Sequence, residues 1–382
     1  MPLPQGFVAH TGRAGLRDVG DDLAIVVATG PCTGAGVFTQ SLFAGPSIEV
    51  SRKHLTAGDA RGVVVIAKNA NVATGSAGLS DAYEVAALAA CAAGLDPAQM
   101  LIASTGVIGR RYPMDLLRRY LGQLQPEAFE AGAGQVARAM MTTDTRPKTA
   151  ERTVGGARVV GVAKGVGMIE PNMATMLAFV FTDAAVAPAV LDDLWRRAVD
   201  STFNCLSVDT DTSTSDTAVV LASGVAGPVD PAALAVALRE VCLDLTLQLA
   251  RDGEGATKLL TVTVHQARDD DQARRVAKAI VNSPLVKTAV HGADPNWGRV
   301  AMAIGKNSDD TDIDPARVVI RFGELETYPS LPDEDGLDAL REVMRADHVD
   351  IDVVLGTGSA ESTVYGCDLS DGYIRINADY TT

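Results

Sequence analysis

Short apolar runs alternate along this chain with segments in which apolar residues recur at helical spacing, and this alternation constrains the fold most. The runs are bounded by Gly, Pro, Asp or Asn, as β-strands usually are. They cover residues 23–27, 63–67, 100–103, 159–162, 176–181, 218–222, 259–264, 318–322 and 351–355. Strands mixed with irregularly spaced helices indicate layers of α and β structure. The sequence therefore predicts a mixed α/β protein.

Several of the predicted helices have recognisable ends. Ser80 is a candidate N-cap for a helix that runs through Ala92. Asp230 followed by Pro231 predicts the start of a helix that reaches residue 249, because proline suits the first helical position. Two further helical patterns cover residues 269–281 and 337–346.

Composition limits both the core and the partners. Of the 382 residues, 47% are hydrophobic but only 4% are aromatic, so small aliphatic side chains must fill most of the core. The net charge of −15 disfavours binding to nucleic-acid phosphates or to an anionic membrane surface. The N-terminus lacks a signal-peptide pattern, and no apolar run approaches the roughly 20 residues of a membrane span. We therefore expect a cytoplasmic protein with no nucleic-acid and no membrane partner.

The cysteines and histidines show no pattern of a disulfide framework or a metal site. The five cysteines are far apart and form no C-x-x-C pair, so we expect reduced cysteines that serve as small hydrophobic residues. The five histidines lack metal-ligand spacing. Acidic stretches at 209–211 and 309–312 lack the central Gly and terminal Glu of a calcium loop, and we expect them to be solvated loops.

Nucleotide-binding patterns are also incomplete. Gly132-x-Gly134-x-x-Ala137 lies within a helical pattern rather than after a strand. Gly305-Lys306 is followed by Asn and has no glycine at the required distance upstream, so it does not form a phosphate loop. We expect neither a metal nor a cofactor.

One segment is unusual by physical criteria: residues 164–175, K-G-V-G-M-I-E-P-N-M-A-T, precede the apolar run 176–181. Its spacing fits either a flexible loop that enters a strand or a strained backbone in which the Thr175 hydroxyl attacks the preceding peptide bond. Cleavage after Ala174 would free the α-amino group of Thr175, which titrates near about 7.7–8.0. Such an amine can act as general base for its own hydroxyl, so the chemistry needs no histidine.

The same segment resembles the self-cleavage site of the ornithine acetyltransferase (glutamate N-acetyltransferase) family. Further blocks in the same order extend the resemblance over nearly the whole chain: 36–39 (GVFT), 104–109 (STGVIG), 141–145 (MTTDT), 252–258 (DGEGATK), 281–289 (VNSPLVKTA) and 294–299 (DPNWGR). The resemblance implies autocatalytic cleavage between Ala174 and Thr175. An alpha chain, residues 1–174, and a beta chain, residues 175–382, would stay together as a heterotetramer of two copies of each.

The resemblance also implies the roles of individual residues. Thr175 would be the catalytic nucleophile, and Thr105 and Gly106 would form the oxyanion hole. Substrate contacts would fall on Thr142, Lys164, Thr175, Glu254, Asn377 and Thr382. Lys164 suits a substrate carboxylate and Glu254 an amino group. Without the resemblance, residues 104–109 are a turn after a strand, Lys164 is a loop lysine and Glu254 is a surface acid.

The implied reaction is a ping-pong transfer of the acetyl group from N2-acetyl-L-ornithine to L-glutamate through acetyl-Thr175. The implied fold is an αββα-type sandwich that resembles N-terminal nucleophile hydrolases but has distinct connectivity. Residues 175–260 would complete the core with the alpha chain, and residues 261–382 would form a smaller C-terminal α/β lobe.

Three stretches depart from the pattern of the arginine-pathway members. They are residues 67–73 (AKNANVA), Thr210 and Ser215 within 208–216, and the ending at 380–382. These features resemble the branch encoded in clavulanic acid gene clusters, so both pathways stay open, as does acetyl-coenzyme A as a donor. The alternative enzyme is a self-processing amidase or aminopeptidase of the same fold, with water as acceptor. The alternative outside catalysis is a silent amino-acid-binding protein on the same scaffold.

Overall fold

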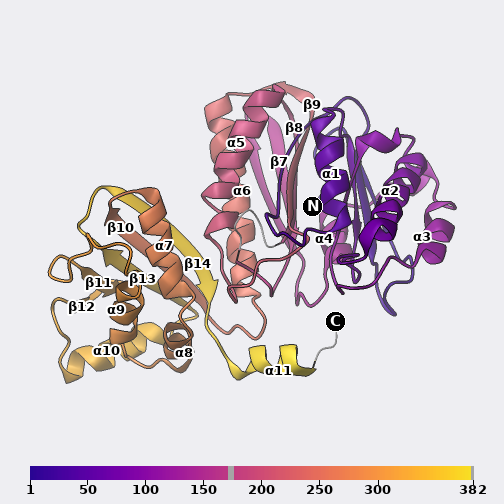
Figure 1. Ribbon diagram of the computed structural model, residues 1–382. Coiled ribbons are helices and arrows are strands. Elements are labelled where there is room, and N and C mark those ends of the chain that lie inside the picture. The colour runs from indigo at the N-terminus through magenta and orange to yellow at the C-terminus, as the bar shows by residue number, and fades with distance from the viewer. Residues whose placement is uncertain (171–175, 380–382) are drawn as a thin grey trace. The chain divides into compact units, whose positions relative to one another are not determined.

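The computed structural model describes residues 1–170 and 176–379 and divides the chain into two compact units (Figure 1). Unit 1 contains residues 1–204 and 211–245, and unit 2 contains residues 205–210 and the described chain from 246 onward. Both units combine sheets with helices, which confirms the predicted mixed α/β class.

The first sheet of unit 1 has the strand order β1-β2-β4-β5. Its strands are β1 (Phe7–Gly12), β2 (Leu23–Ala28), β4 (Gly62–Ile66) and β5 (Met100–Ser104). The pair β4 and β5 is parallel and the other pairs are antiparallel. Helices α2 (Gly75–Ala92) and α3 (Met114–Leu121) cover one face, where Val85 and Leu117 pack with Ile25 and Ile102 (Figure 1).

The second sheet of unit 1 has the order β3-β9-β8-β7-β6. Its strands are β3 (Thr33–Phe38), β6 (Lys148–Val154), β7 (Ala157–Lys164), β8 (Leu177–Ala185) and β9 (Thr217–Pro228). Only β8 and β9 run parallel. Helices α5 (Pro188–Asp200) and α6 (Pro231–Arg251) pack on this sheet (Figure 1). The buried Trp195 of α5 donates to Ala218 O, and Gly161 of β7 lies under Val241 and Leu245 of α6.

The facing sides of the two sheets share one core, which is built mainly from small aliphatic residues as the composition predicts. Val26 and Val65 of the first sheet belong to the same buried cluster as Val162, Phe179 and Val219 of the second. Helices α1 (Pro46–Thr56) and α4 (Ala133–Met140) also contribute to this cluster. The succession of helix, sheet, sheet and helix is the predicted αββα architecture.

Unit 2 is built on one five-stranded sheet with the order β12-β11-β13-β10-β14. The strands are β10 (Leu259–Ala267), β11 (Val319–Phe322), β12 (Leu325–Tyr328), β13 (His348–Val354) and β14 (Ala360–Cys367). Helices α7 (Asp270–Val281), α8 (Pro284–Gly292), α9 (Gly298–Gly305) and α10 (Glu334–Met344) share a core with these strands. Helix α11 (Asp371–Asp379) follows β14. The short 3-10 turns of the chain are Pro97–Gln99, Pro126–Ala128 and Phe203–Cys205.

Each of the nine predicted strands coincides with an observed strand, with small differences at the ends. Strands β1, β3, β6, β12 and β14 were not predicted. These strands are partly buried or glycine-rich, such as KTAERTV in β6 and TGAGVF in β3, so they lack a continuous apolar run. Their positions become clear only from the strands with which they pair.

Two of the predicted helix starts are confirmed and one is wrong. Asp230 accepts hydrogen bonds from the first turn of α6, and the Asp269 carboxylate accepts one from Gln272 N at 2.7 Å. Ser80 is not an N-cap, because α2 already begins at Gly75. The Ser80 hydroxyl instead donates to the Ser76 carbonyl oxygen one turn earlier.

Two further expectations need correction. Asp310 is buried rather than solvated, because it accepts hydrogen bonds from Arg268, Gln272 and Arg275. All five cysteines are unbridged, but Cys91 is exposed and therefore does not serve as a buried hydrophobic residue. Within the described part of the chain, no helix has the length and apolar character that a membrane crossing requires.

Candidate active site

Unit 1 places four predicted site residues at the ends of secondary-structure elements. Thr105 and Gly106 directly follow β5, Lys164 is the last residue of β7, and Thr142 follows α4. The predicted cleavage residues Ala174 and Thr175, and the predicted substrate contact Thr382, lie outside the described residues.

The first described residues after the predicted cut enter the second sheet beside Lys164. The Met176 carbonyl oxygen accepts a hydrogen bond from Thr217 N at 3.0 Å. In the antiparallel pairing of β7 with β8, Leu177 lies opposite Lys164. The strand that follows the predicted cut therefore begins next to the predicted substrate lysine.

The segment around Gly106 lies against the backbone of Lys68. Thr105 N donates to Ile66 O at 3.0 Å, and Val107 N donates to Lys68 O at 3.3 Å. Gly106 has a φ of +128°, and a Cβ at this position would lie 2.2 Å from the carbonyl carbon of Lys68. No side chain fits in that space, so the close approach of the two segments requires glycine.

Lys164 and Thr105 are in direct contact. The Lys164 ammonium donates a hydrogen bond to Thr105 Oγ1 at 3.2 Å, and Lys164 is only 8% exposed. An ammonium group can only donate, so the Thr105 oxygen is the acceptor in this bond. The hydroxyl proton of Thr105 is therefore available for a different acceptor, as an oxyanion hole requires.

A buried carboxylate, Asp144, connects this pair to Thr142. Its Oδ2 accepts a hydrogen bond from Thr142 N at 3.0 Å and lies 4.0 Å from Lys164 Nζ. Its Oδ1 accepts from Gly165 N and from Lys148 Nζ, each at 2.7 Å. Asp144 was not among the predicted site residues, although it lies in the MTTDT block that carries part of the resemblance.

Neighbouring charges keep Asp144 ionised. Burial by itself raises the pKa of this carboxyl group, but Lys164 and Lys148 outweigh burial and lower the pKa to about 2. Lys148 is itself completely buried. Asp144 is therefore a carboxylate at neutral pH.

Asp216, the residue before β9, behaves in the opposite way. Its Oδ2 is buried and has no hydrogen-bond partner within residues 1–170 and 176–379. Burial raises the pKa of Asp216 well above its usual range, and Ser213 and Lys164 offset this only in part. Lys148 and Lys164 both lie beside the ionised Asp144. The ammonium of Lys164 suits a substrate carboxylate.

Lys68 is a second residue that the sequence analysis left without a role. Its Nζ donates to the Thr142 carbonyl oxygen at 2.9 Å. Lys68 also has a left-handed backbone, with a φ of 74°. It thus links Thr142 to the segment that contacts Gly106. The departure from the family pattern at residues 67–73 was the only sequence signal at this position.

Unit 2 brings the other two described residues together. Asn377 Nδ2 donates to Glu254 Oε2 at 2.9 Å and also contacts the Tyr373 carbonyl oxygen. Asn377 lies in α11, so the C-terminal segment is ordered at this residue. The loop of Glu254 contacts the start of α11, since a Cβ on Gly255 would lie 2.3 Å from Tyr373 N.

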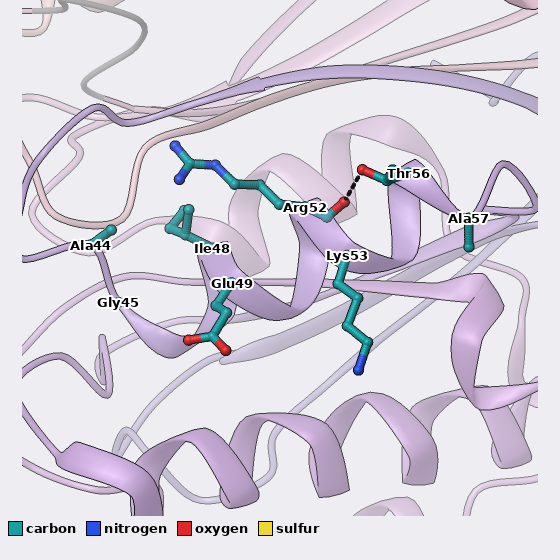
Figure 2. Close-up of a pocket in the computed structure, with 8 residues that line it drawn as sticks. All are labelled: Ala44, Gly45, Ile48, Glu49, Arg52, Lys53, Thr56 and Ala57. Carbon is teal, nitrogen blue, oxygen red and sulfur yellow. Dashed lines mark hydrogen bonds between the residues drawn. The ribbon is translucent and has the colours of Figure 1, made fainter.

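A hollow of about 700 Å³ lies on α1, apart from these residues (Figure 2). Its lining consists of Ala44, Gly45, Ile48, Glu49, Arg52, Lys53, Thr56 and Ala57. The two basic side chains there have structural neighbours: Arg52 donates to Thr39 O, and Lys53 lies 5.1 Å from the centre of the Tyr83 ring. None of the predicted site residues lines this hollow.

Comparison with known proteins places the chain among full-length relatives. It matches the ArgJ family over residues 8–382. It is 55% identical over 379 residues to the arginine biosynthesis bifunctional protein ArgJ 2 of Nostoc sp., which covers 99% of this chain and 98% of that protein. It is 56% identical over 385 residues to the glutamate N-acetyltransferase Oat2 of Streptomyces clavuligerus, with the same coverage. A crystal structure of the Bacillus halodurans ArgJ protein is 42% identical with a TM-score of 0.51, and covers 54% of this chain and 100% of that chain.

Proposed function

This chain belongs to the ArgJ family and is a glutamate N-acetyltransferase, and we propose that it works through a covalent acetyl group on Thr175. In this proposal the chain first cuts itself between Ala174 and Thr175. It then moves the acetyl group of N2-acetyl-L-ornithine to L-glutamate by a ping-pong mechanism. The observation that carries the proposal is the contact between Lys164 and Thr105, beside the strand that begins after the cut.

Self-cleavage proceeds by attack of the Thr175 hydroxyl on the carbonyl carbon of Ala174. The peptide bond breaks as an ester forms, and water then hydrolyses the ester. The products are a carboxylate on Ala174 and an amino group on Thr175. The extent of the match to the Bacillus halodurans structure supports such a cut. The match covers all of that chain but only 54% of this one. Residues 175–382 make up nearly the same share of this chain.

Acetyl transfer uses the same hydroxyl. The amino group of Thr175 takes the hydroxyl proton as the oxygen attacks the acetyl carbonyl carbon. The Thr105 hydroxyl and the Gly106 N–H donate to the oxyanion. The amide bond breaks, and ornithine leaves with the proton on its amine. The amine of glutamate then attacks the acetyl carbonyl carbon of acetyl-Thr175. The ester bond breaks, the amine proton passes through the Thr175 amino group to the Thr175 oxygen, and N-acetylglutamate leaves.

Both amino acids have an α-carboxylate, and the charges near Lys164 support recognition of this shared group. The paired Glu254 and Asn377 offer acceptors for an amino group. The relative from Streptomyces clavuligerus supports the resemblance to the clavulanic acid branch. Small amino acids are the substrates in either pathway.

The test uses the purified full chain, analysed by denaturing gel and intact mass. We expect wild type to consist of fragments that end at Ala174 and begin at Thr175. Thr175→Ala should stay uncut and inactive. Thr105→Ala should lower kcat by about 10²–10³-fold. Thr153→Ala, which changes an exposed threonine of β6, is the matched control and should behave as wild type.

The same assay separates the alternatives. It compares acetylornithine with acetyl-coenzyme A as donor, and glutamate with water as acceptor. Release of free acetate faster than formation of N-acetylglutamate would favour an amidase. Full activity of Thr175→Ala would refute the acetyl-threonine mechanism.

A further inference from the structure

Asp144 contacts three parts of the candidate site with its two carboxylate oxygens. One oxygen accepts from Thr142 N and faces Lys164, while the other accepts from Gly165 N and Lys148. The carboxylate therefore fixes the backbone on both sides of Lys164 Nζ: the 142 segment and the residue that follows Lys164. A side chain in this position controls where the lysine ammonium points.

The ammonium of Lys164 points at Thr105, so the contacts form a chain from carboxylate to ammonium to hydroxyl. A hydroxyl oxygen that accepts a hydrogen bond from a cation becomes a stronger donor, because successive hydrogen bonds polarise one another. This effect is larger in a buried site, where water does not screen the charge. Both Asp144 and Lys164 are at least nine-tenths buried.

We propose that Asp144 is a positioning residue for acetyl transfer: it holds Lys164 against Thr105, so that the Thr105 hydroxyl becomes a stronger donor to the oxyanion. This inference rests on the proposed function, which assigns Thr105 to the oxyanion hole. It gives Lys164 a role in the chemical step in addition to substrate binding. An ammonium has three N–H donors, so the two roles are compatible.

The two roles make different kinetic predictions. A lysine that only binds the substrate carboxylate contributes equally to ground state and transition state, so its loss raises KM and leaves kcat unchanged. A lysine that strengthens an oxyanion donor acts mainly in the transition state, so its loss lowers kcat. The oxyanion forms in both half-reactions, so acetylation and deacetylation should slow by the same factor.

The matched pair of variants is Asp144→Asn and Asp183→Asn. Asp183 of β8 is also buried in unit 1, and each of its oxygens accepts a backbone N–H, from Gln5 at 3.0 Å and from Arg158 at 2.6 Å. These residues have no role in the proposed site. Asp183→Asn therefore repeats the loss of a buried carboxylate without touching Lys164.

Rapid quenching and mass spectrometry measure acetylation of Thr175 by acetylornithine and its deacetylation by glutamate. We expect Asp144→Asn to slow both steps by roughly 10–100-fold, the size of effect seen when partners that orient metal ligands are lost, with little change in KM. Lys164→Gln is the second variant and should give a similar loss of rate. Asp183→Asn should retain the wild-type rates. Thermal melting verifies that each variant is folded, and rates refer to the cleaved fraction.

A double-mutant cycle tests whether Asp144 acts through Thr105. In a Thr105→Ala background, the additional effect of Asp144→Asn should shrink to about twofold or less. Independent, multiplicative effects would overturn the inference, as would a rise in KM without loss of rate. If Asp144→Asn stays uncut, the rate of self-cleavage replaces the transfer rates, because we expect the oxyanion of its tetrahedral intermediate to accept from the same Thr105 hydroxyl. If Thr105→Ala is then cleaved at the wild-type rate while Asp144→Asn stays uncut, the inference is overturned.

The outcomes distinguish this inference from the function on which it rests. If Thr105→Ala keeps the wild-type transfer rates, Thr105 is not part of the oxyanion hole and the proposed site is wrong. If Thr105→Ala lowers the transfer rates whereas Asp144→Asn keeps the wild-type rates, the proposed site stands and only the role of Asp144 is wrong.

Discussion

Two buried aspartates of unit 1 show how neighbours decide the charge of a side chain. Asp144 has two lysines and two backbone N–H donors around it, so its pKa falls despite burial. Asp216 is also buried, but its Oδ2 has no partner among the described residues, and burial raises its pKa. The same residue type therefore has a lowered pKa at one position and a raised pKa at the other.

Gly106 gives a prediction at the scale of one residue. Gly106→Ala places a Cβ 2.2 Å from the Lys68 carbonyl carbon, so the segment must move. We expect a loss of about 3 kcal/mol or more in unfolding free energy, together with loss of activity. Gly109→Ala is the control, because Gly109 also has a positive φ, +83°, but open space around its Cβ position. It should cost only about 1–2 kcal/mol. Urea unfolding measures both, and equal losses would contradict the prediction.

At the scale of the element, α11 depends on the loop of residues 252–258. The Ser370 hydroxyl donates to the Gly255 carbonyl oxygen at 2.5 Å, and Asn377 donates to Glu254. Gly255 has a φ of +71° and lies against the backbone of Tyr373. The loop thus holds both ends of a helix that is otherwise exposed.

Gly255→Ala is therefore expected to displace α11. The added Cβ would lie 2.3 Å from Tyr373 N, which is well inside the van der Waals contact distance of the two atoms. Limited proteolysis should remove the C-terminal segment faster than in wild type, and acetyl transfer should fall while self-cleavage stays normal. Gly292→Ala, at the end of α8 with open space around its Cβ position, is the control in the same unit. Equal proteolysis of the two variants would show that the loop does not hold α11.

At the scale of the whole molecule, the predicted cut falls within a sheet rather than between domains. Strands β3, β6 and β7 precede residue 174, whereas β8 and β9 follow it. In the sheet, β9 and β8 lie between β3 and β7. Strands of the two predicted fragments are thus hydrogen-bonded along most of their length and share the core of unit 1.

The cut protein should therefore behave as one folded species. We expect the fragments to elute together in native buffer and to separate only in denaturant, with one unfolding midpoint for both. Light scattering should give the mass of two alpha and two beta chains, the proposed heterotetramer. Uncut Thr175→Ala is the control and should elute at the same position. Separation of the fragments under native conditions would contradict the shared sheet.

Much of this architecture could be predicted from local patterns. Continuous apolar runs marked the central strands, such as β2 and β4, because these strands are buried on both faces. Strands such as β6 and β14 were not predicted, because only part of each is buried and neither has a continuous apolar run. Ser80 was misjudged as a cap because a cap depends on where the helix starts, and small residues at 75–78 extend α2 toward its N-terminus.

The family follows from the amino-acid sequence alone, because residue types in ordered blocks identify it. The same blocks predict the nucleophile Thr175 and the substrate-binding residues. How these residues are supported follows from the folded structure. Asp144, Lys68 and Asp216 have no distinctive local pattern, and their roles come from contacts between segments that are far apart in the chain. Charge and hydrogen-bond direction depend on burial and on neighbouring groups, and both arise only when the sheets pack together.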